Sequence, residues 1–305
     1  MNKPESVSIR VPATTANLGA GFDCIGVALS LYNQFQFTAS DSATTITVEG
    51  VESGTISLEE DNLLYRSFSH LYQHIGKKVP AVNIRVKVNV PLARGLGSSA
   101  TAIVGGLLAA NHFASYPLSP EQLLDLAIEI EGHPDNVAPA MLGGCILSVG
   151  DRGNRHFVPI DCHETIRFVV AIPDFELSTS QARAVLPQFL SYEQAVFNIA
   201  HLGLLVKALE TGKPEWLKEA LKDKLHQPYR QSLIRGYERV YEAVLGAGGH
   251  GMVISGAGPT LLALCSPGCV SEVMRAMGES WGEEGVRATV RCLEVDREGA
   301  KVIVP

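Results

Sequence analysis

A short stretch rich in glycine and hydroxyl side chains is the strongest sign of chemistry in this 305-residue sequence. It reads Pro-Leu-Ala-Arg-Gly-Leu-Gly-Ser-Ser-Ala-Thr over residues 91–101. Gly95 and Gly97 allow positive φ and a close approach to a ligand, so that successive backbone N–H groups can point toward an anion. The hydroxyl groups that follow, those of Ser98, Ser99 and Thr101, can bind phosphate oxygens or a phosphate-bound Mg²⁺. The stretch predicts a phosphate-binding loop.

The elements on either side of this loop are predicted to be a strand and a helix. Apolar and polar residues alternate from Val82 to Val90, the period of a half-buried strand, which should end at Pro91. The run that begins near Ser98 favours a helix, whose N-terminus attracts anions. The spacing fits neither a Walker A loop nor the dinucleotide pattern Gly-x-Gly-x-x-Gly. Alternatively, the stretch is only a glycine turn whose serines cap the helix, without a role in ligand binding.

Local signals place further elements before and after the loop. Residues 7–11 alternate as a strand that should end at Pro12, and residues 13–23 favour a tight loop. A capping box at residues 119–122 should open a helix that runs to about Glu131. Other predicted elements are strands at residues 145–149 and 168–172 and helices at residues 192–210 and 214–225.

The order of these elements predicts an α+β protein with two domains. Strands and helices follow one another without a regular βαβ rhythm, which argues against a doubly wound sheet. The polar stretch at residues 151–156 is the predicted boundary, which gives an N-terminal domain over residues 1–155 and a C-terminal domain over residues 156–305.

The composition is that of an ordinary globular chain with an excess of acidic residues. Hydrophobic residues make up 46% of it and charged residues 19%, with a net charge of −7. This charge argues against a nucleic-acid or membrane partner, because both would select a basic face. We see neither a secretion signal nor an 18-residue apolar span. Six scattered cysteines favour a reduced, cytoplasmic chain.

The phosphate loop closely resembles the Pro-x-x-x-Gly-Leu-Gly-Ser-Ser-Ala signature of the GHMP kinases. Residues 255–260 (Ser-Gly-Ala-Gly-Pro-Thr) resemble the third motif of these enzymes, and residues 12–23 resemble the first. The resemblance implies a ribosomal-protein-S5-like N-terminal domain, a ferredoxin-like C-terminal domain, and ATP and Mg²⁺ as cofactors. The implied ATP-binding residues are Asn62, Pro91, Leu92, Ala93, Arg94, Gly95, Leu96, Gly97, Ser98, Ser99, Ala100 and Thr101.

Within this superfamily the sequence resembles the homoserine kinases. The string His-Pro-Asp-Asn-Val-Ala-Pro at residues 133–139 matches their version of one loop, with Asn136 where mevalonate kinase-like relatives carry an aspartate. The resemblance implies that ATP phosphorylates L-homoserine to O-phospho-L-homoserine, a step toward threonine. Further matching strings lie at residues 16–19, 21–23, 61–63, 178–180 and 228–230, together with Arg183.

A homoserine zwitterion needs an anion for its ammonium and a cation for its carboxylate. Asp23 is the candidate anion, and Arg183 and Arg230 are the candidate cations, because a guanidinium pairs bidentately with a carboxylate. The remaining candidate substrate contacts are Asn17, His133, Asn136 and Thr179. Each of these residues could instead cap a helix, sit in a loop or join a surface ion pair.

The resemblance implies a glutamate that holds Mg²⁺, and two residues compete for that role. The Glu-x-Glu-Gly string of longer relatives favours Glu129, while Glu131 falls on the apolar side of its helix, where a carboxylate needs a partner. We rank Glu129 slightly ahead and expect Ser99 as a further metal ligand.

The candidate catalytic residues are Asn136, His133 and Arg183. An amide cannot hold a proton, and phosphoryl transfer through a loose transition state demands little deprotonation beforehand. We therefore expect the hydroxyl proton to leave to the transferring phosphate, with His133 as the competing general base.

The oligomeric state remains open, and so do three other functions. They are a GHMP kinase that acts on another small alcohol, a non-catalytic ligand sensor, and a nucleotide-dependent decarboxylase on the same fold. The paired arginines and Asn136 favour homoserine as the substrate. The retained serines of the loop and the glutamates argue against a non-catalytic sensor. We keep a homodimer open.

Overall fold

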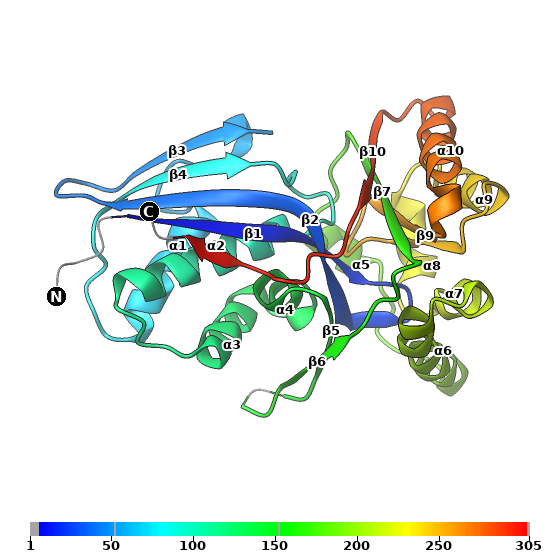
Figure 1. The fold of residues 1–305 in the computed structure, drawn as a ribbon, viewed down its shortest axis with the longest axis horizontal. Coiled ribbons are helices and arrows are strands. Elements are labelled where there is room, and N and C mark those ends of the chain that lie inside the picture. The colour runs from blue at the N-terminus through cyan, green and yellow to red at the C-terminus, as the bar shows by residue number, and fades with distance from the viewer. Residues whose placement is uncertain (1–5, 52, 152, 304–305) are drawn as a thin grey trace.

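A computed structural model describes residues 6–51, 53–151 and 153–303 of the chain. It contains two β-sheets, each with helices packed against it, and is a mixed α+β fold (Figure 1). No helix in the described residues is long and apolar enough to cross a membrane.

The first sheet has seven strands. Its main path runs β11-β1-β2-β4-β3, and β5 pairs with both β2 and β6. All pairs are antiparallel except β3 with β4. The strands are β1 (Ser6–Asn17), β2 (Gly21–Ala39), β3 (Thr45–Gly50), β4 (Val82–Val88), β5 (Cys145–Val149), β6 (His156–Ile160) and β11 (Lys301–Ile303).

Four helices cover one face of this sheet (Figure 1). The inward residues of its strands and helices form one apolar core, in which Phe37 of β2 stacks on Phe68 with ring centroids 5.2 Å apart. These helices are α1 (Leu63–His74), α2 (Ser98–Phe113), α3 (Pro120–Glu131) and α4 (Pro134–Leu142). The buried helix α2 starts directly after the phosphate loop, so the core fixes where that loop ends.

The second sheet has four antiparallel strands in the order β10-β7-β9-β8. These are β7 (Arg167–Pro173), β8 (Gly251–Ile254), β9 (Leu261–Cys265) and β10 (Ala288–Leu293). Successive residues of β7 point to opposite faces of the sheet, because side chains alternate along a strand. They therefore pack in two different apolar cores, one on each face.

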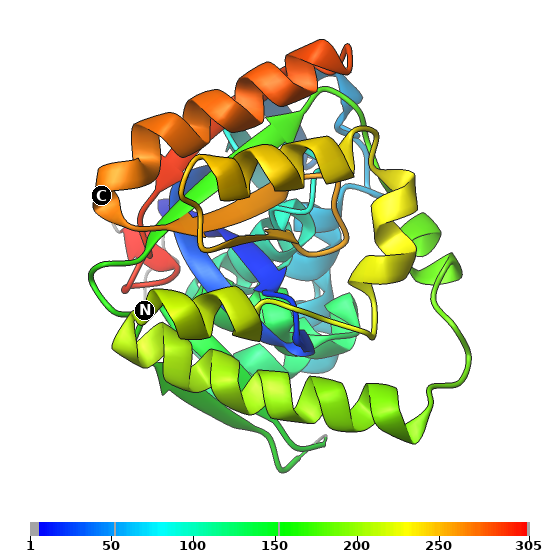
Figure 2. The ribbon, with the colours of Figure 1, turned by 90° about the vertical axis from the view of Figure 1, so that its right-hand side faces the viewer.

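Helices lie on both faces of the second sheet, with α9 and α10 at the top of Figure 2 and α6 and α7 at the bottom. The core under α6 and α7 also takes in side chains of β2, so it joins the two sheets. The helices of this half are α5 (Thr179–Ala184), α6 (Tyr192–Thr211), α7 (Pro214–Ala220), α8 (Gln227–Arg230), α9 (Tyr237–Gly246) and α10 (Val270–Glu283). Short 3-10 helices span Ser53–Thr55, Gln231–Leu233 and Pro267–Cys269.

The structure confirms several local predictions and corrects three. The capping box is present, because Ser119 and Gln122 each accept a hydrogen bond from the other's backbone N–H, and α3 ends at Gly132. The predicted end of the first strand at Pro12 is wrong, since β1 continues to Asn17 after a register shift at Pro12/Ala13 that accommodates the proline. The expected loop shrinks to a turn at residues 18–20, and α7 ends at Ala220, earlier than predicted.

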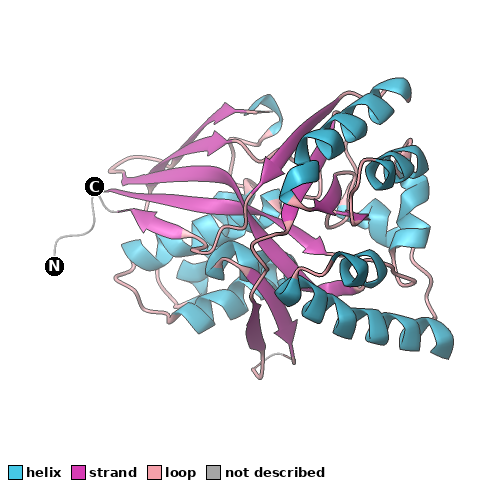
Figure 3. Ribbon diagram, turned by 45° about the vertical axis from the view of Figure 1, so that its right-hand side comes forward, coloured by secondary structure: helices cyan, strands magenta, loops and turns pink. Residues whose placement is uncertain are grey.

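Strand pairing crosses the predicted domain boundary. The predicted boundary falls in the hairpin that β5 and β6 form, which Figure 3 shows at the lower edge of the strands, and residue 152 lies outside the described residues. Near the C-terminus, β11 returns to pair with β1. The division at residue 155 stays a prediction, but the first sheet includes strands on both sides of it.

The first core generates a stability prediction. Leu107 of α2 is completely buried, whereas Leu58 is 54% exposed in a surface turn. Leu107→Ala should lower the free energy of unfolding by about 2–5 kcal/mol, because it leaves a cavity in packed surroundings. The matched substitution Leu58→Ala should change it by less than about 0.5 kcal/mol. Urea denaturation followed by circular dichroism measures both, and equal effects would contradict the described packing.

Candidate active site

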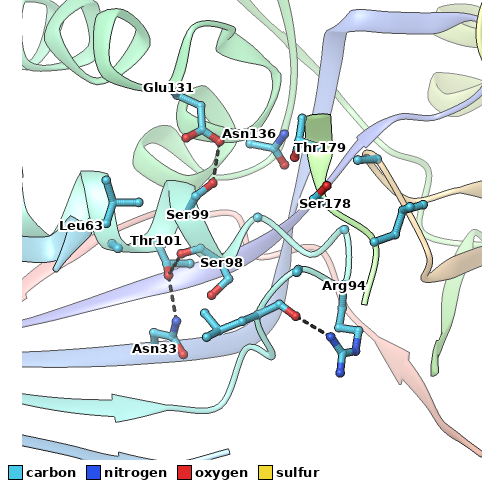
Figure 4. A pocket seen from close by; sticks show the side chains of 18 of the residues that line it. Asn33, Leu63, Arg94, Ser98, Ser99, Thr101, Glu131, Asn136, Ser178 and Thr179 are labelled. Atoms are coloured by element: carbon cyan, nitrogen blue, oxygen red, sulfur yellow. Dashed lines mark hydrogen bonds between the residues drawn. The ribbon is translucent and has the colours of Figure 1, made fainter. Parts of the chain in front are cut away.

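One cavity of about 400 Å³ gathers residues from both halves of the chain (Figure 4). Its lining comes from strands β1, β2 and β4, the start of α1, the phosphate loop, the junction of α3 and α4, helix α5, Arg230 of α8 and the turn at residues 256–258. Elements that are far apart in sequence therefore meet around a single space.

The phosphate loop takes the backbone shape that its glycines predict. Gly95 and Gly97 have φ of 74° and 66°, in the left-handed region that favours glycine. Gly97 is also the N-cap of α2, so the N-terminus of this helix faces the cavity. A Cβ atom at Gly97 would collide with the hydroxyl of Thr14, and one at Gly95 with the carbonyl oxygen of Ser255. Both glycines are therefore needed for the packing of the loop.

The glycine-rich turn at residues 255–260 packs directly on the phosphate loop. The hydroxyl of Ser255 donates to the carbonyl oxygen of Gly95 at 2.7 Å. The backbone N–H of Thr260 donates to the carbonyl oxygen of Arg94 at 3.2 Å. The third motif thus holds the loop from the side of the second sheet.

Asn33 of β2 braces the loop from the side of the first sheet. Its Oδ1 accepts hydrogen bonds from the backbone N–H groups of Asn89 and Val90 at 2.8 and 2.9 Å. Its Nδ2 donates to the hydroxyl of Thr101 at 2.8 Å, and that hydroxyl donates to the carbonyl oxygen of Ser98. The Thr101 hydroxyl is therefore engaged within the protein, although the residue lines the cavity.

Most of the predicted site residues line this cavity, and a few do not. Leu96 and Ala100 point into the protein core, and neither Pro91 nor Glu129 is among the lining residues. Asn62 lines the cavity, but its Oδ1 caps α1 by accepting from the backbone N–H of Leu64 at 3.0 Å. The predicted residues that line it are Asn17, Asp23, Asn62, Leu92, Ala93, Arg94, Gly95, Gly97, Ser98, Ser99, Thr101, Glu131, His133, Asn136, Thr179, Arg183 and Arg230.

The two competing glutamates occupy different environments. Glu131 faces the phosphate loop, and the hydroxyl of Ser99 donates to its Oε1 at 2.7 Å (Figure 4). Burial raises the pKa of Glu131, and this is opposed in part by the Ser99 hydrogen bond. Glu129 lies on the exposed side of α3. Of the two carboxylates, only that of Glu131 lies beside the loop hydroxyls.

The His-Pro-Asp-Asn string forms the first turn of α4 rather than a loop. Nδ1 of His133 lies 2.6 Å from Oδ1 of the buried Asp135. Burial alone would lower the pKa of His133, but the hydrogen bond and charge of Asp135 and the other nearby carboxylates raise it above its ordinary value. His133 is therefore held beside an anion.

Asn136 is fixed at both ends of its amide. Its Oδ1 accepts from the hydroxyl of Thr14 at 2.8 Å, and its Nδ2 donates to Asp135 at 3.3 Å. One Nδ2 hydrogen remains for a ligand, since an amide nitrogen carries two.

Asp23 and Arg183 form a bidentate ion pair with each other. Nη1 and Nη2 of Arg183 donate to the two carboxylate oxygens at 3.1 and 2.8 Å. Asn17 positions this end of the cavity, because its Oδ1 accepts from the N–H of Asp23 and its Nδ2 donates to the carbonyl oxygen of Gly256. The predicted anion and one predicted cation thus lie together, half-exposed to the cavity.

Arg230 is a buried cation held by neutral groups. Its Nε donates to the carbonyl oxygen of Ala182 at 3.0 Å, and its Nη1 donates to that of Gly256 at 3.1 Å. It makes no ion pair within the described residues, although it is only 2% exposed. Burial and neighbouring Arg183 lower its pKa to about 10, so it is still charged at neutral pH.

The buried side chain of His226 contacts this arginine. Its Nε2 lies 3.0 Å from the carbonyl oxygen of Gly19 and its Nδ1 lies 3.4 Å from Nη1 of Arg230. Burial lowers the pKa of His226 to about 4, so the ring is neutral near pH 7. A neutral ring with the proton on Nε2 can donate to Gly19 and accept from Arg230. Phe22 stacks on the same ring at 4.9 Å and lies against both guanidinium groups.

Comparison with known proteins agrees with this arrangement. The profile of the GHMP kinases N terminal domain matches residues 62–144, and that of the GHMP kinases C terminal matches residues 205–283. A homoserine kinase of Crocosphaera subtropica is 57% identical over 300 residues, which cover 97% of each chain. A homoserine kinase of Trichormus variabilis is 55% identical and covers 98% of this chain and 100% of its own. The chain belongs to the homoserine kinase family.

A solved structure supports the same assignment at the level of the fold. The crystal structure of the homoserine kinase from Cytophaga hutchinsonii matches with a TM-score of 0.89 at 29% identity, covering 99% of both chains. The fold described above is therefore that of a GHMP kinase with its N- and C-terminal domains.

Several residues that shape this GHMP kinase site were not identified individually from the sequence. Asp135 and Gly256 lie within recognised strings, but nothing in their type pointed to their contacts with His133 and Arg230. Thr14 lies within the first motif, although its contact with Asn136 was not expected, and Asn33 and His226 belong to no recognised string. Only the folded chain brings them to the cavity or to its supporting layer.

Proposed function

We propose that the protein transfers the γ-phosphoryl group of ATP to the hydroxyl of L-homoserine. The observation that carries this is the meeting of a phosphate loop with the carboxylate of Asp23 and the guanidinium groups of Arg183 and Arg230 in one cavity. A phosphate site beside charges of both signs suits a zwitterionic alcohol.

Recognition of the amino acid rests on the balance of these charges. Arg230 is buried without a carboxylate, and a substrate carboxylate would supply the anion that such a group needs. The Asp23–Arg183 pair is accessible and can exchange partners, so that Asp23 accepts from the ammonium while Arg183 turns to the carboxylate. Thr179 and Asn17 lie beside these groups and complete the proposed substrate contacts.

The nucleotide is proposed to occupy the part of the cavity next to the first sheet. The phosphate loop offers backbone N–H groups and hydroxyls to the phosphates. Apolar side chains of β2, β4, the start of α1 and the loop before α1 line the adjoining space, where they would enclose an adenine ring. These residues are Phe35, Ile56, Leu63, Leu64, Val86 and Val88.

The residues beside the loop fit a magnesium ion. Magnesium prefers oxygen ligands, and the carboxylate of Glu131 lies next to the hydroxyl of Ser99 at the loop. Burial disfavours an isolated charge on Glu131, so a cation there would stabilise the ionised form. When bound, Mg²⁺ would neutralise charge on the phosphates. We therefore propose Glu131 and Ser99 as its protein ligands and no longer rank Glu129 ahead.

The transfer step is proposed to run without a dedicated general base. The substrate hydroxyl oxygen attacks the γ-phosphorus, the bond to the β–γ bridging oxygen breaks, and ADP leaves. The hydroxyl proton passes to an oxygen of the transferred phosphoryl group. Asn136 orients the hydroxyl through its remaining N–H, while His133, paired with Asp135, adds positive charge nearby.

The proposed ligands are ATP and L-homoserine. A cytoplasmic location and a homodimer stay predictions of the sequence. A GHMP kinase for an uncharged or purely anionic alcohol remains the second candidate, but it would leave the carboxylate of Asp23 without a substrate partner.

The first functional prediction concerns the substrate. With ATP and Mg²⁺, L-homoserine should stimulate ADP release at least tenfold more than mevalonate, shikimate or galactose. Two analogues that each lack one charge should lose about 10²-fold or more in kcat/KM. 3-Aminopropanol leaves the buried Arg230 without an anion, and 4-hydroxybutanoate lacks the ammonium that Asp23 would accept from. A coupled assay for ADP measures this. Stimulation by another alcohol but not by homoserine would refute the proposed function.

The second prediction separates the two glutamates. Glu131→Gln should lower kcat/KM by about 10²–10³-fold and weaken the Mg²⁺ dependence of ATP binding, because a charged metal ligand is lost. Glu129→Gln, two residues away on the exposed side of α3, should stay within about threefold of the parent. Steady-state kinetics and calorimetry at varied Mg²⁺ measure both. The reverse pattern would assign the metal to Glu129.

The third prediction tests the base-free step. A general base typically contributes about 10²–10⁴-fold. His133→Gln should therefore reduce kcat by less than about tenfold and raise KM for homoserine, because glutamine keeps a polar group but not the charge. His74→Gln, at the exposed end of α1, is the matched control. Near-complete loss of kcat at unchanged KM would show that His133 is the base.

A further inference from the structure

Arg94 belongs to the phosphate loop, but its guanidinium group lies apart from the loop hydroxyls of Ser98 and Ser99 (Figure 4). The residue is only 5% exposed although its side chain carries a charge. A charged group is stable in such surroundings only where hydrogen bonds and an opposite charge replace the lost water. The partners of this guanidinium group therefore indicate what the side chain does.

The guanidinium group donates to main-chain carbonyl oxygens of two chain segments. Within the loop, Nη1 donates to the carbonyl oxygen of Leu92 at 2.9 Å. Outside the loop, Nε donates to that of Pro173 at 3.0 Å and Nη2 to that of Asp174 at 3.4 Å. An arginine offers several N–H donors in one rigid plane, so a single side chain can hold both segments.

The positive charge of Arg94 has a counter-charge within the chain. Its Nη1 lies 3.4 Å from Oε1 of Glu176, two residues beyond Asp174. Arg230, in contrast, makes no ion pair within the described residues. The charge of Arg94 is therefore in part neutralised without a ligand, which leaves its geometry as the larger contribution.

The second segment that Arg94 holds leads into the proposed homoserine site. It joins the end of β7 at Pro173 to the start of α5 at Thr179, and we call it the β7–α5 segment (residues 173–179). Ser178 is the N-cap of α5, so the end of the segment determines where this helix begins. Thr179, and Arg183 one turn later, both line the cavity.

A main-chain hydrogen bond joins the same two segments beside Arg94. The N–H of Leu177 donates to the carbonyl oxygen of Ala93 at 3.1 Å. Ala93 has a φ of 50°, a left-handed conformation that a residue with a side chain keeps only where its surroundings hold it. The β7–α5 segment thus stabilises the shape of the loop, while the loop fixes the position of the segment.

We propose that Arg94 is a positioning residue, whose guanidinium group holds the proposed nucleotide and homoserine sites in register by joining the phosphate loop to the β7–α5 segment. This inference rests on the proposed function, which assigns the phosphates to the loop and the amino acid to Thr179 and Arg183. The attacking oxygen must lie about 3–3.5 Å from phosphorus, and a misplacement of about 1 Å can cost about 10²-fold in rate. The side chain acts through this geometry, while the backbone of Arg94 remains part of the predicted phosphate loop.

The test compares the two substrates in one variant. Arg94→Ala should raise both the dissociation constant of a non-hydrolysable ATP analogue and the KM for homoserine about tenfold, and lower kcat/KM about 10²-fold. A side chain that bound only phosphates would change the nucleotide constant alone. Arg287→Ala is the matched control, because Arg287 donates to the side chain of Asp174 at 3.0 Å but is exposed. It should stay within about twofold of the parent, as a surface ion pair contributes little.

Two further measurements separate geometry from charge and from a general loss of stability. Arg94→Lys keeps the charge but lacks the planar fork, so both constants should stay raised in a variant that folds. In Arg94→Ala, added guanidinium chloride at about 20 mM should restore at least about a fifth of kcat/KM, because the free ion can donate to the same carbonyl oxygens. A cavity of about 360 Å³, lined by Arg94, Pro173 and Asp174, leads to the vacated space. Sodium chloride at equal concentration should restore nothing.

Three results would overturn the proposal. They are kinetic constants of Arg94→Ala that match the parent, a fully active Arg94→Lys, and a folded Arg94→Ala that guanidinium does not rescue. Failure of the proposed function is recognised separately, because the parent would then not be stimulated by homoserine. The KM of the alcohol that does stimulate the parent would take the place of homoserine in the same comparison.

Discussion

The close contact between the phosphate loop and the turn at residues 255–260 is the constraint on which the rest of the site depends. The two segments approach so closely that a Cβ atom at Gly95 would overlap the backbone of Ser255. The first sheet supplies the loop and the second supplies the turn, so the loop has its shape only when both are in place. The same turn presents the carbonyl oxygen of Gly256 to Asn17 and Arg230. The proposed phosphate-binding and charge-recognition sites thus share one support.

The balance of charges is the second physical constraint on the cavity. Buried charges are stable only with partners, and the site pairs His133 with Asp135 and Arg183 with Asp23. Arg230 is the exception, since it makes no ion pair within the described residues and donates only to carbonyl oxygens and to the neutral ring of His226. A site that keeps one cation without an anion is prepared for an anionic group of the ligand. A ligand that brought a carboxylate alone would leave Asp23 and Arg183 paired as they are, whereas the proposed zwitterionic substrate would use both charges of that accessible pair.

Local sequence rules predicted the parts of the fold that local interactions decide. The capping box before Pro120 and the glycine geometry of the phosphate loop depend on neighbours within a few residues, and both were predicted correctly. The continuation of β1 past Pro12 depends on pairing with β2, which local alternation cannot show. The Asp23–Arg183 pair joins residues 160 positions apart, so resemblance could name its members without predicting their contact. Helix periodicity did place Glu131 on the inner side of α3, where the structure has it.

The inner side of α6 supports the proposed substrate site. On the inner side, Nδ2 of the buried Asn198 donates to Oδ1 of Asp223 at 2.7 Å. The other oxygen of Asp223 accepts from the backbone N–H of His226 at 2.9 Å, and so holds the start of the short helix α8 that ends in Arg230. A four-residue helix has too few internal hydrogen bonds to fix its own position. The position of Arg230 therefore depends on where α6 lies.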